Sequence, residues 1–216
     1  MYARHDLVWL TAPGWLAARA AAAPAHAEAL ARWQSEDWPL TVRRDDADCA
    51  PGQLGLGLSP APAGGAKVRI AVRAAPADVA RSTAPLPLKA VLAALPGWWR
   101  LPLRALHDES LGLTLRAYGS VALQALTGQD YIGPASDIDL LFYPNTERQL
   151  RAGLALLTKH AGALPLDGEV VFPGDRAVAW KEWIVAEARQ ARVLVKERGG
   201  VRLAPVNALL ASLGAA

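Results

Sequence analysis

Two carboxylates separated by one residue form the part of this sequence best suited to chemistry. Asp137 and Asp139 lie in the run SDIDLLFY, whose alternation predicts a β-strand. Successive strand side chains point to opposite faces, so both carboxylates share one face while Ile138, Leu140 and Phe142 enter the core. Such a pair repels itself unless a divalent cation neutralises it, as in the Mg²⁺ sites of phosphoryl-transfer enzymes. The pair predicts a Mg²⁺ site; the alternative is a solvent-facing edge strand with two acidic residues.

A glycine–serine pair upstream of the two aspartates predicts an anion-binding site. The run LTLRAY predicts a strand, and VALQAL after it predicts a short helix that ends at Gly128. Ser120 is expected at the N-cap, where the first turn directs free backbone N–H groups at a ligand and Gly119 permits its close approach. The alternative is an ordinary serine cap with no ligand.

A third carboxylate is expected near the pair, because two-metal phosphoryl transfer commonly needs a further ligand or base. Asp167 and Glu169 share a face of the strand-like run LPLDGEVVF, and the sequence favours Asp167 only slightly. Each residue could instead lie on an exposed edge. Lys181 and Lys196 are candidate phosphate contacts or, alternatively, solvated cations.

The elements that carry these residues indicate an α+β protein. We expect a small N-terminal α+β domain at residues 1–85 and a second domain at residues 86–216, with a mixed sheet and flanking helices. Prolines in the segment Arg81–Lys89 favour a boundary there. Trp98 and Trp99 are expected to pack at the junction between the two domains.

Basic residues of the N-terminal half suggest recognition of anionic ligands. Arg43 and Arg44 end the predicted strand PLTVRR and are expected to bind substrate phosphates. The run KVRIAVR predicts a strand with Lys67, Arg69 and Arg73 on one face. That face is either a solvated surface or one that steers an acidic protein partner.

Composition limits the function classes. The chain has 216 residues, of which 52% are hydrophobic and 20% are charged, so it is globular over most of its length. The net charge of +3 is too small to favour nucleic-acid binding. A single cysteine excludes an intrachain disulfide and fits a reducing, cytoplasmic location, and no apolar stretch is long enough to predict a membrane span.

The glycine–serine pair and the later strand with alternating aspartates resemble the nucleotidyltransferase superfamily, to which DNA polymerase beta and kanamycin nucleotidyltransferase belong. More narrowly, the chain resembles the malonate decarboxylase holo-acyl-carrier-protein synthases, also called phosphoribosyl-dephospho-CoA transferases. The motifs that carry this likeness are RHDLVWL, PLTVRR, GSVALQALTGQDYIGPASDIDLLFYP, DGEVVFP and VAWKEW. They span nearly the whole chain.

This resemblance implies transfer of 2′-(5″-triphosphoribosyl)-3′-dephospho-CoA to a serine of the acyl-carrier subunit of malonate decarboxylase, with release of pyrophosphate. It implies that Asp137 and Asp139 hold Mg²⁺ on the triphosphate. It also implies that Gly119 and Ser120 bind the outer phosphates. Asp167 or Glu169 would orient or deprotonate the serine. Two alternatives are a nucleotidyltransferase that adenylylates another hydroxyl and a non-catalytic module that binds a carrier protein.

Overall fold

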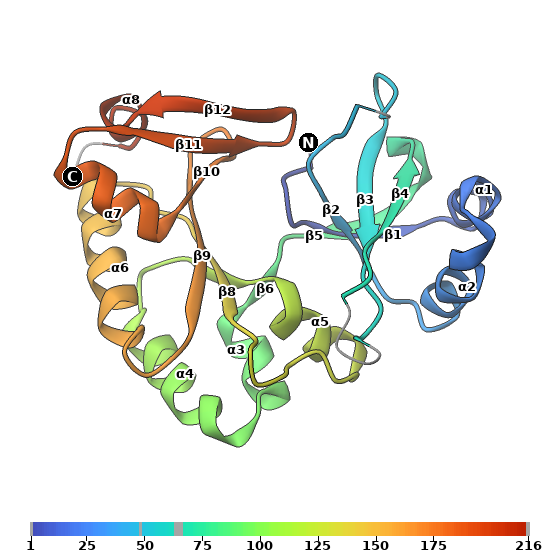
Figure 1. The fold of residues 1–216 in the computed structure, drawn as a ribbon, viewed down its shortest axis with the longest axis horizontal. Coiled ribbons are helices and arrows are strands. Elements are labelled where there is room, and N and C mark those ends of the chain that lie inside the picture. Colours follow the sequence, from blue (N-terminus) through green and yellow to red (C-terminus); the bar gives the residue numbers. More distant parts are fainter. Residues whose placement is uncertain (1, 48, 63–66, 215–216) are drawn as a thin grey trace. The chain divides into compact units, whose positions relative to one another are not determined.

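The computed structural model describes residues 2–47, 49–62 and 67–214 and shows an α+β protein with two β-sheets. The expected fold class is thereby confirmed. The chain separates into two compact units (Figure 1). One comprises Met1–Pro85 with Arg198–Gly200, and the other comprises Leu86–Glu197 with Val201–Ala216.

The N-terminal unit contains a five-stranded antiparallel sheet in the order β4-β3-β2-β1-β5. Its strands are β1 (Leu7–Leu10), β2 (Leu40–Val42), β3 (Leu54–Leu58), β4 (Ile70–Ala74) and β5 (Val79–Thr83). Two helices, α1 (Ala12–Ala21) and α2 (Ala27–Ser35), join β1 to β2. Alternate apolar side chains of the strands, such as Val8, Leu40 and Leu56, are fully buried and form the core of this unit.

The predicted basic strand is shorter than expected. Strand β4 begins at Ile70, so Lys67 and Arg69 precede it as exposed residues, and only Arg73 lies on the strand. The prediction that Lys67, Arg69 and Arg73 share one face of a strand is therefore wrong. Alternation of residue types continues past the strand end here, and it cannot show where hydrogen bonding to β3 stops.

The C-terminal unit contains a seven-stranded sheet in the order β12-β11-β10-β9-β8-β7-β6. Its strands are β6 (Leu86–Pro87), β7 (Leu115–Ala117), β8 (Ile138–Phe142), β9 (Leu166–Phe172), β10 (Arg176–Ala179), β11 (Arg192–Glu197) and β12 (Gly200–Pro205). Strands β8 and β9 pair in parallel, whereas β7 pairs with β8 and β9 with β10 in antiparallel register. The sheet is thus mixed, and its parallel pair lies near the centre.

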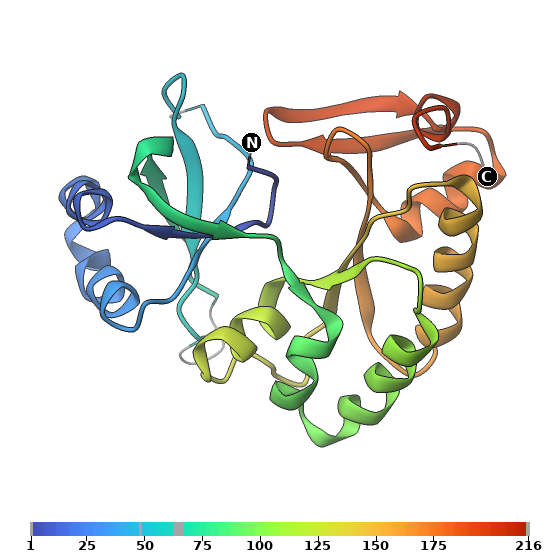
Figure 2. The same ribbon diagram turned by 180° about the vertical axis from the view of Figure 1, so that it is seen from behind.

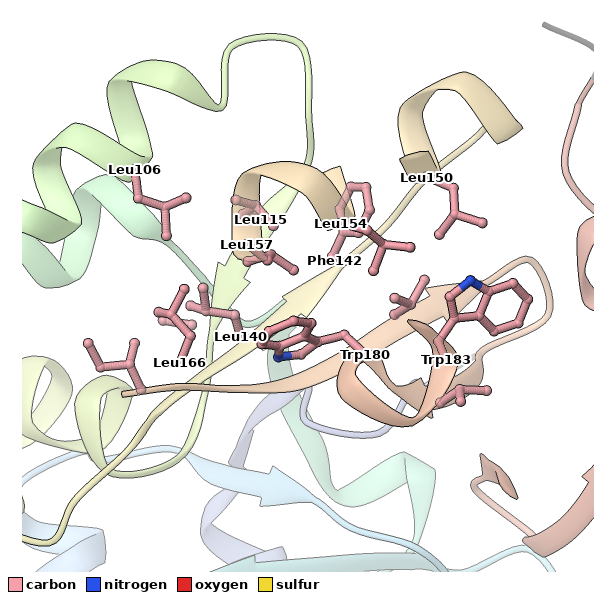
Figure 3. Close-up of a cluster of buried hydrophobic side chains, with 14 of the residues drawn as sticks. Leu106, Leu115, Leu140, Phe142, Leu150, Leu154, Leu157, Leu166, Trp180 and Trp183 are labelled. Carbon is pink, nitrogen blue, oxygen red and sulfur yellow. The ribbon is translucent and has the colours of Figure 1, made fainter. Parts of the chain in front are cut away.

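Helices cover this sheet and bury its core. They are α3 (Leu88–Val91), α4 (Gly97–Glu109), α5 (Gly119–Thr127), α6 (Glu147–His160), α7 (Trp180–Ala188) and α8 (Val206–Leu210). Helix α6 is the crossover that makes a parallel β8–β9 pair sterically feasible. Figure 3 shows leucines of α6 facing Phe142 of β8, with Trp180 and Trp183 of α7 in the same cluster. This apolar layer packs against β8 and β9, the strands that carry the candidate site.

The two tryptophans after Pro96 have different environments. Trp99 is buried in the core of the C-terminal unit, but Trp98 is 69% exposed. The expectation of packing is wrong for the exposed Trp98, and the packing of Trp99 lies within the C-terminal unit. Both residues belong to α4, and helical geometry directs consecutive side chains about 100° apart, so one enters the core as the next faces solvent.

Helix α4 is held to α6 by packing and by a charged contact, and both views show the two helices side by side (Figure 1, Figure 2). Lys159 Nζ donates to Glu109 Oε2 at 2.6 Å, and His160 Nε2 lies 3.2 Å from the same oxygen. The hydrogen bond from Lys159, followed by that with His160, lowers the pKa of the Glu109 carboxyl. A carboxyl with a lowered pKa in the folded state loses its stabilising effect as the pH falls through that pKa.

Candidate metal and substrate site

Three carboxylates meet at the start of the parallel strand pair. Asp139 is the second residue of β8 and lies in register with Asp167, the second residue of β9, while Asp137 directly precedes β8. One oxygen of each carboxylate lies within 4.8 Å of the other two. We call Asp137, Asp139 and Asp167 the carboxylate cluster. All three residues are partly exposed, so an ion or substrate in solution can reach them.

The predicted alternation holds at the start of β8, although Leu141, on the same face as Asp139, is also buried. Ile138, Leu140 and Phe142 are almost completely buried, and the aspartates lie on the opposite side. Strand β8 has β7 on one side and β9 on the other, so it is not an edge strand. The alternative of an acidic edge is therefore wrong, and the carboxylates of the cluster lie close together on central strands of the sheet.

The chemistry of the cluster suits a hard divalent cation. Its donors are carboxylate oxygens, which Mg²⁺, Mn²⁺ and Ca²⁺ prefer over nitrogen and sulfur ligands. Lys181 Nζ, from the first turn of α7, lies 3.4 Å from Asp167 Oδ1 and balances part of the negative charge. Both side chains are about half exposed, so this ion pair contributes little stability and leaves Lys181 accessible to an anion.

Gly119 and Asp139 are in close contact. Gly119 opens α5 with a positive φ of 66°, and a Cβ on this residue would overlap Asp139 Oδ2. The preceding residue, Tyr118, donates its backbone N–H to the Asp139 carbonyl oxygen at 3.1 Å. The missing side chain at position 119 therefore makes room for a cluster carboxylate at the N-terminus of α5, where the helix dipole favours negative charge.

Ser120 does not cap the helix. Tyr118 occupies the N-cap position in an extended conformation without a side-chain hydrogen bond, and Ser120 lies inside the first turn. The predicted N-cap is therefore wrong, because the turn is made by the positive φ of Gly119 rather than by a serine oxygen. The predicted end of the helix is confirmed, since Gly128 is the C-cap in the left-handed conformation.

The two candidates for the third carboxylate have different environments. Asp167 belongs to the cluster, whereas Glu169 is only 4% exposed and accepts a hydrogen bond from Lys196 Nζ at 2.9 Å. Lys196 is thus paired with a buried carboxylate rather than solvated. The geometry favours Asp167 as the residue that works with Asp137 and Asp139.

Gly168 sets the distance between β8 and β9. It lies between the two candidates with φ of 126°, and a Cβ here would overlap the carbonyl oxygen of Leu140. Local sequence patterns did not predict this role, because the partner of Gly168 is distant in the chain. The signal available was a glycine inside a strand pattern, which often marks a close approach of two backbones.

Gly168→Ala should lower the free energy of unfolding by at least about 2 kcal/mol, since alanine must adopt an unfavourable φ and also push the strands apart. Gly97→Ala is the control, because a Cβ at the start of α4 meets no atom within 4 Å. Urea denaturation followed by circular dichroism measures both variants. Equal stability of the two variants would contradict the assigned close approach.

Gln124 was also missed, and it ties α5 to the connection that leads to Asp137. Its Nε2 donates to the Ala94 carbonyl oxygen at 2.6 Å, and its Oε1 accepts from the backbone N–H groups of Tyr131 at 3.0 Å and Ile132 at 3.1 Å. A glutamine in an apolar helix gives no sequence signal for such distant partners. The side chain positions the segment immediately before the carboxylate cluster.

The predicted arginines of the N-terminal unit differ in their contacts. Arg43 pairs with Asp46, which also binds Arg73 Nη2 at 3.1 Å. Arg44 is exposed and has no ion-pair partner among the residues that the structure describes. Of the two arginines, Arg44 is better placed to form an ion pair with an anionic ligand.

Comparisons with known proteins cover the whole chain. Residues 3–85 match the model of the phosphoribosyl-dephospho-CoA transferase MdcG N-terminal domain, and residues 87–207 match that of its C-terminal domain. A phosphoribosyl-dephospho-CoA transferase of Xanthomonas campestris pv. campestris (strain 8004) is 40% identical over 97% of both chains. The transferase of Xanthomonas euvesicatoria pv. vesicatoria (strain 85-10) gives the same values, and that of Bradyrhizobium diazoefficiens is 36% identical over 83% of this chain and 80% of its own.

These matches, with the two-unit α+β fold and the carboxylate cluster, define the chain as a transferase. It belongs to the phosphoribosyl-dephospho-CoA transferase family. No solved structure gives a significant match. In the part of the chain that the structure describes, no helix is long and apolar enough to cross a membrane.

Proposed function

We propose that this chain transfers the phosphoribosyl-dephospho-CoA group from 2′-(5″-triphosphoribosyl)-3′-dephospho-CoA to a serine of the acyl-carrier subunit of malonate decarboxylase. The observation that carries the proposal is the carboxylate cluster, placed by in-register β8 and β9 in a chain that matches transferases of this name over its length. The resemblance to malonate decarboxylase holo-acyl-carrier-protein synthases supports the choice of acceptor.

The proposed reaction is a displacement at phosphorus. The serine Oγ forms a bond to the phosphorus nearest the ribose, the bond between that phosphorus and the bridging oxygen breaks, and pyrophosphate leaves with the bonding electrons. Asp167 orients the serine hydroxyl and accepts its proton directly or through water. Lys181, beside Asp167, offers a positive charge to the phosphates.

The cluster fits Mg²⁺ by its donor set of carboxylate oxygens, and we propose Asp137 and Asp139 as its ligands. Bound there, Mg²⁺ would supply charge stabilisation for the triphosphate and for the leaving pyrophosphate. The backbone N–H groups of Gly119 and Ser120, in the first turn of α5, are proposed to bind the outer phosphates. Glu169 acts indirectly in this scheme, because it holds the ammonium group of Lys196.

We propose two functional domains, which comprise residues 1–85 and residues 86–216. We propose the cytoplasm as the location of the reaction. Arg43 and Arg44 of the first domain are proposed to bind the precursor. Because Arg43 also pairs with Asp46, the direct contact is assigned to Arg44.

Pyrophosphate release tests the proposed function. A coupled assay should record pyrophosphate only when Mg²⁺, the triphosphoribosyl precursor and the apo carrier subunit are all present. Replacing the precursor with ATP should abolish the signal. Release from ATP with another hydroxyl acceptor would instead support adenylylation, and no release under any condition would support a non-catalytic carrier-binding module.

Arg44→Ala should weaken precursor binding about tenfold at both low and high ionic strength, because a charge-assisted hydrogen bond to a partly desolvated phosphate resists screening. Titration calorimetry with the precursor measures this change. Arg19→Ala is the control, since Arg19 is an exposed arginine of the same unit that contacts Gln34. An unchanged affinity in Arg44→Ala would remove this residue from the proposed site.

A further inference from the structure

A basic cavity lies among helices of the C-terminal unit, and none of the carboxylate cluster residues lines it. Its volume is about 620 Å³, and it is bounded by α3, the turn that follows α3, and α4. The wall contains Lys89, Arg100, Arg104, His107, Asp108 and Leu92. Three side chains are thus permanently positive against one carboxylate, so the cavity attracts negative charge.

The basic side chains differ in how firmly they are held. Arg100 Nη2 donates to the Leu95 carbonyl oxygen at 2.9 Å, which fixes this guanidinium at the end of the turn. Lys89 and Arg104 are exposed, and neither has an ion-pair partner among the described residues. Their charges are therefore available to a ligand from solution.

An apolar strip adjoins this cavity on the same helix. Trp98 is 69% exposed and Leu101 is 74% exposed, although the opposite side of α4 buries Trp99 and Leu103. Positions three apart are neighbours on a helix surface, so Trp98 adjoins Leu101, and Leu101 in turn adjoins Arg104. We call Lys89, Trp98, Leu101 and Arg104, together with Arg100, the α4 surface.

We propose that the α4 surface docks the protein substrate through an acidic, partly apolar face of that protein. The proposal rests on the proposed function, which requires the enzyme to hold a folded acceptor while one of its serines reacts. Tryptophan and arginine are the residues most enriched at the energetic centres of protein interfaces. A small phosphorylated ligand would use the cationic cavity alone and would leave Trp98 and Leu101 without a role, so the combination favours a protein.

Arg104→Glu tests the charged part of this surface. Calorimetric titration of the full-length enzyme with the apo carrier subunit should show binding weakened about tenfold at low ionic strength, with a smaller difference at high ionic strength. The KM for the carrier should rise equally, while the affinity for the precursor stays unchanged. Arg148→Glu, the same reversal at an exposed position of α6, should bind the carrier as the wild type does.

Trp98→Ala tests the apolar part. Because Trp98 is mostly exposed, its removal leaves no core cavity, and a thermal melt should match that of the wild type. Carrier binding should weaken at both ionic strengths, since apolar contact is not screened by salt. The loss of carrier binding should therefore depend on ionic strength in Arg104→Glu but not in Trp98→Ala.

The outcomes separate this inference from the proposed function. Unchanged carrier binding in both variants, or equal loss in the Arg148→Glu control, would overturn the docking surface. Loss of precursor affinity in Arg104→Glu with normal carrier binding would also overturn it and would make the cavity a phosphate site. A wild-type enzyme that binds the carrier but transfers nothing would refute the proposed function, and the same titrations would still decide where the carrier binds.

Discussion

Asp139→Asn should lower the rate of prosthetic-group transfer by about a thousandfold or more while the protein remains folded. Asp139 is a member of the carboxylate cluster at the start of β8, and its side chain is partly exposed rather than part of the core. The substitution keeps the shape of the side chain but removes a negative charge that the proposed cation requires. Asp137→Asn should behave in the same way.

The loss of the negative charge in Asp139→Asn should increase the stability of the protein, although it lowers the activity. In the absence of a divalent cation, the three carboxylates repel one another within 4.8 Å, so removing one should raise the melting temperature. Added Mg²⁺ should stabilise the wild type and have little effect on Asp139→Asn. Asp130→Asn is the control, an exposed aspartate in the loop before the cluster. A variant Asp139→Asn that retains most activity would contradict the assigned site.

Gly119→Ala should lower the transfer rate about a hundredfold, because the new methyl group would displace the Asp139 carboxylate that lies against Gly119. Displacement of a catalytic group by about 1 Å is sufficient for a loss of this size. Ser120→Ala, one residue further on, should be milder. It removes one hydroxyl, and a single hydrogen bond contributes about 1 kcal/mol.

Gly128→Ala separates steric displacement from backbone strain. Gly128 closes the same helix with φ of 68°, close to the 66° of Gly119, but a Cβ at position 128 meets no atom within 4 Å. Both variants should lose similar stability from the left-handed conformation. Only Gly119→Ala should lose the thermal shift with Mg²⁺ and most of its activity. Equal activity losses in the two variants would show that strain, rather than contact with Asp139, matters at position 119.

Local patterns predicted the elements on which the site is built. Alternation in SDIDLLFY correctly separated the buried Leu140 from the partly exposed Asp139, because the side-chain period of a strand is fixed by its backbone. Gly128 marked the end of α5 correctly, since few other residues adopt the left-handed cap.

Features that depend on distant partners could not be predicted locally. Strand order and register bring Asp167 opposite Asp139, whereas Glu169, on the same predicted strand face, is buried and paired with Lys196. Gly168 owes its role to the Leu140 carbonyl oxygen on the neighbouring strand.

Two helices show how local signals can also mislead or pass unnoticed. Helix α4 contains Pro102 in its interior, which argues against a helix because proline lacks an N–H and disfavours the preceding turn. Helix α6 carries a recognisable pattern, with Thr146 as its cap and Leu150, Leu154 and Leu157 on its buried side, but it is absent from the elements expected above. In α4, packing on the sheet outweighs the local effect of the proline.

The intact mass of the apo acyl-carrier subunit, measured before and after incubation with the enzyme, Mg²⁺ and the triphosphoribosyl precursor, tests the central claim most directly. We expect the carrier to gain the mass of one phosphoribosyl-dephospho-CoA group on its serine with wild-type enzyme, and no gain with Asp139→Asn or with a carrier that lacks the serine hydroxyl. An unmodified carrier with folded wild-type enzyme, or equal modification by Asp139→Asn, would contradict the claim.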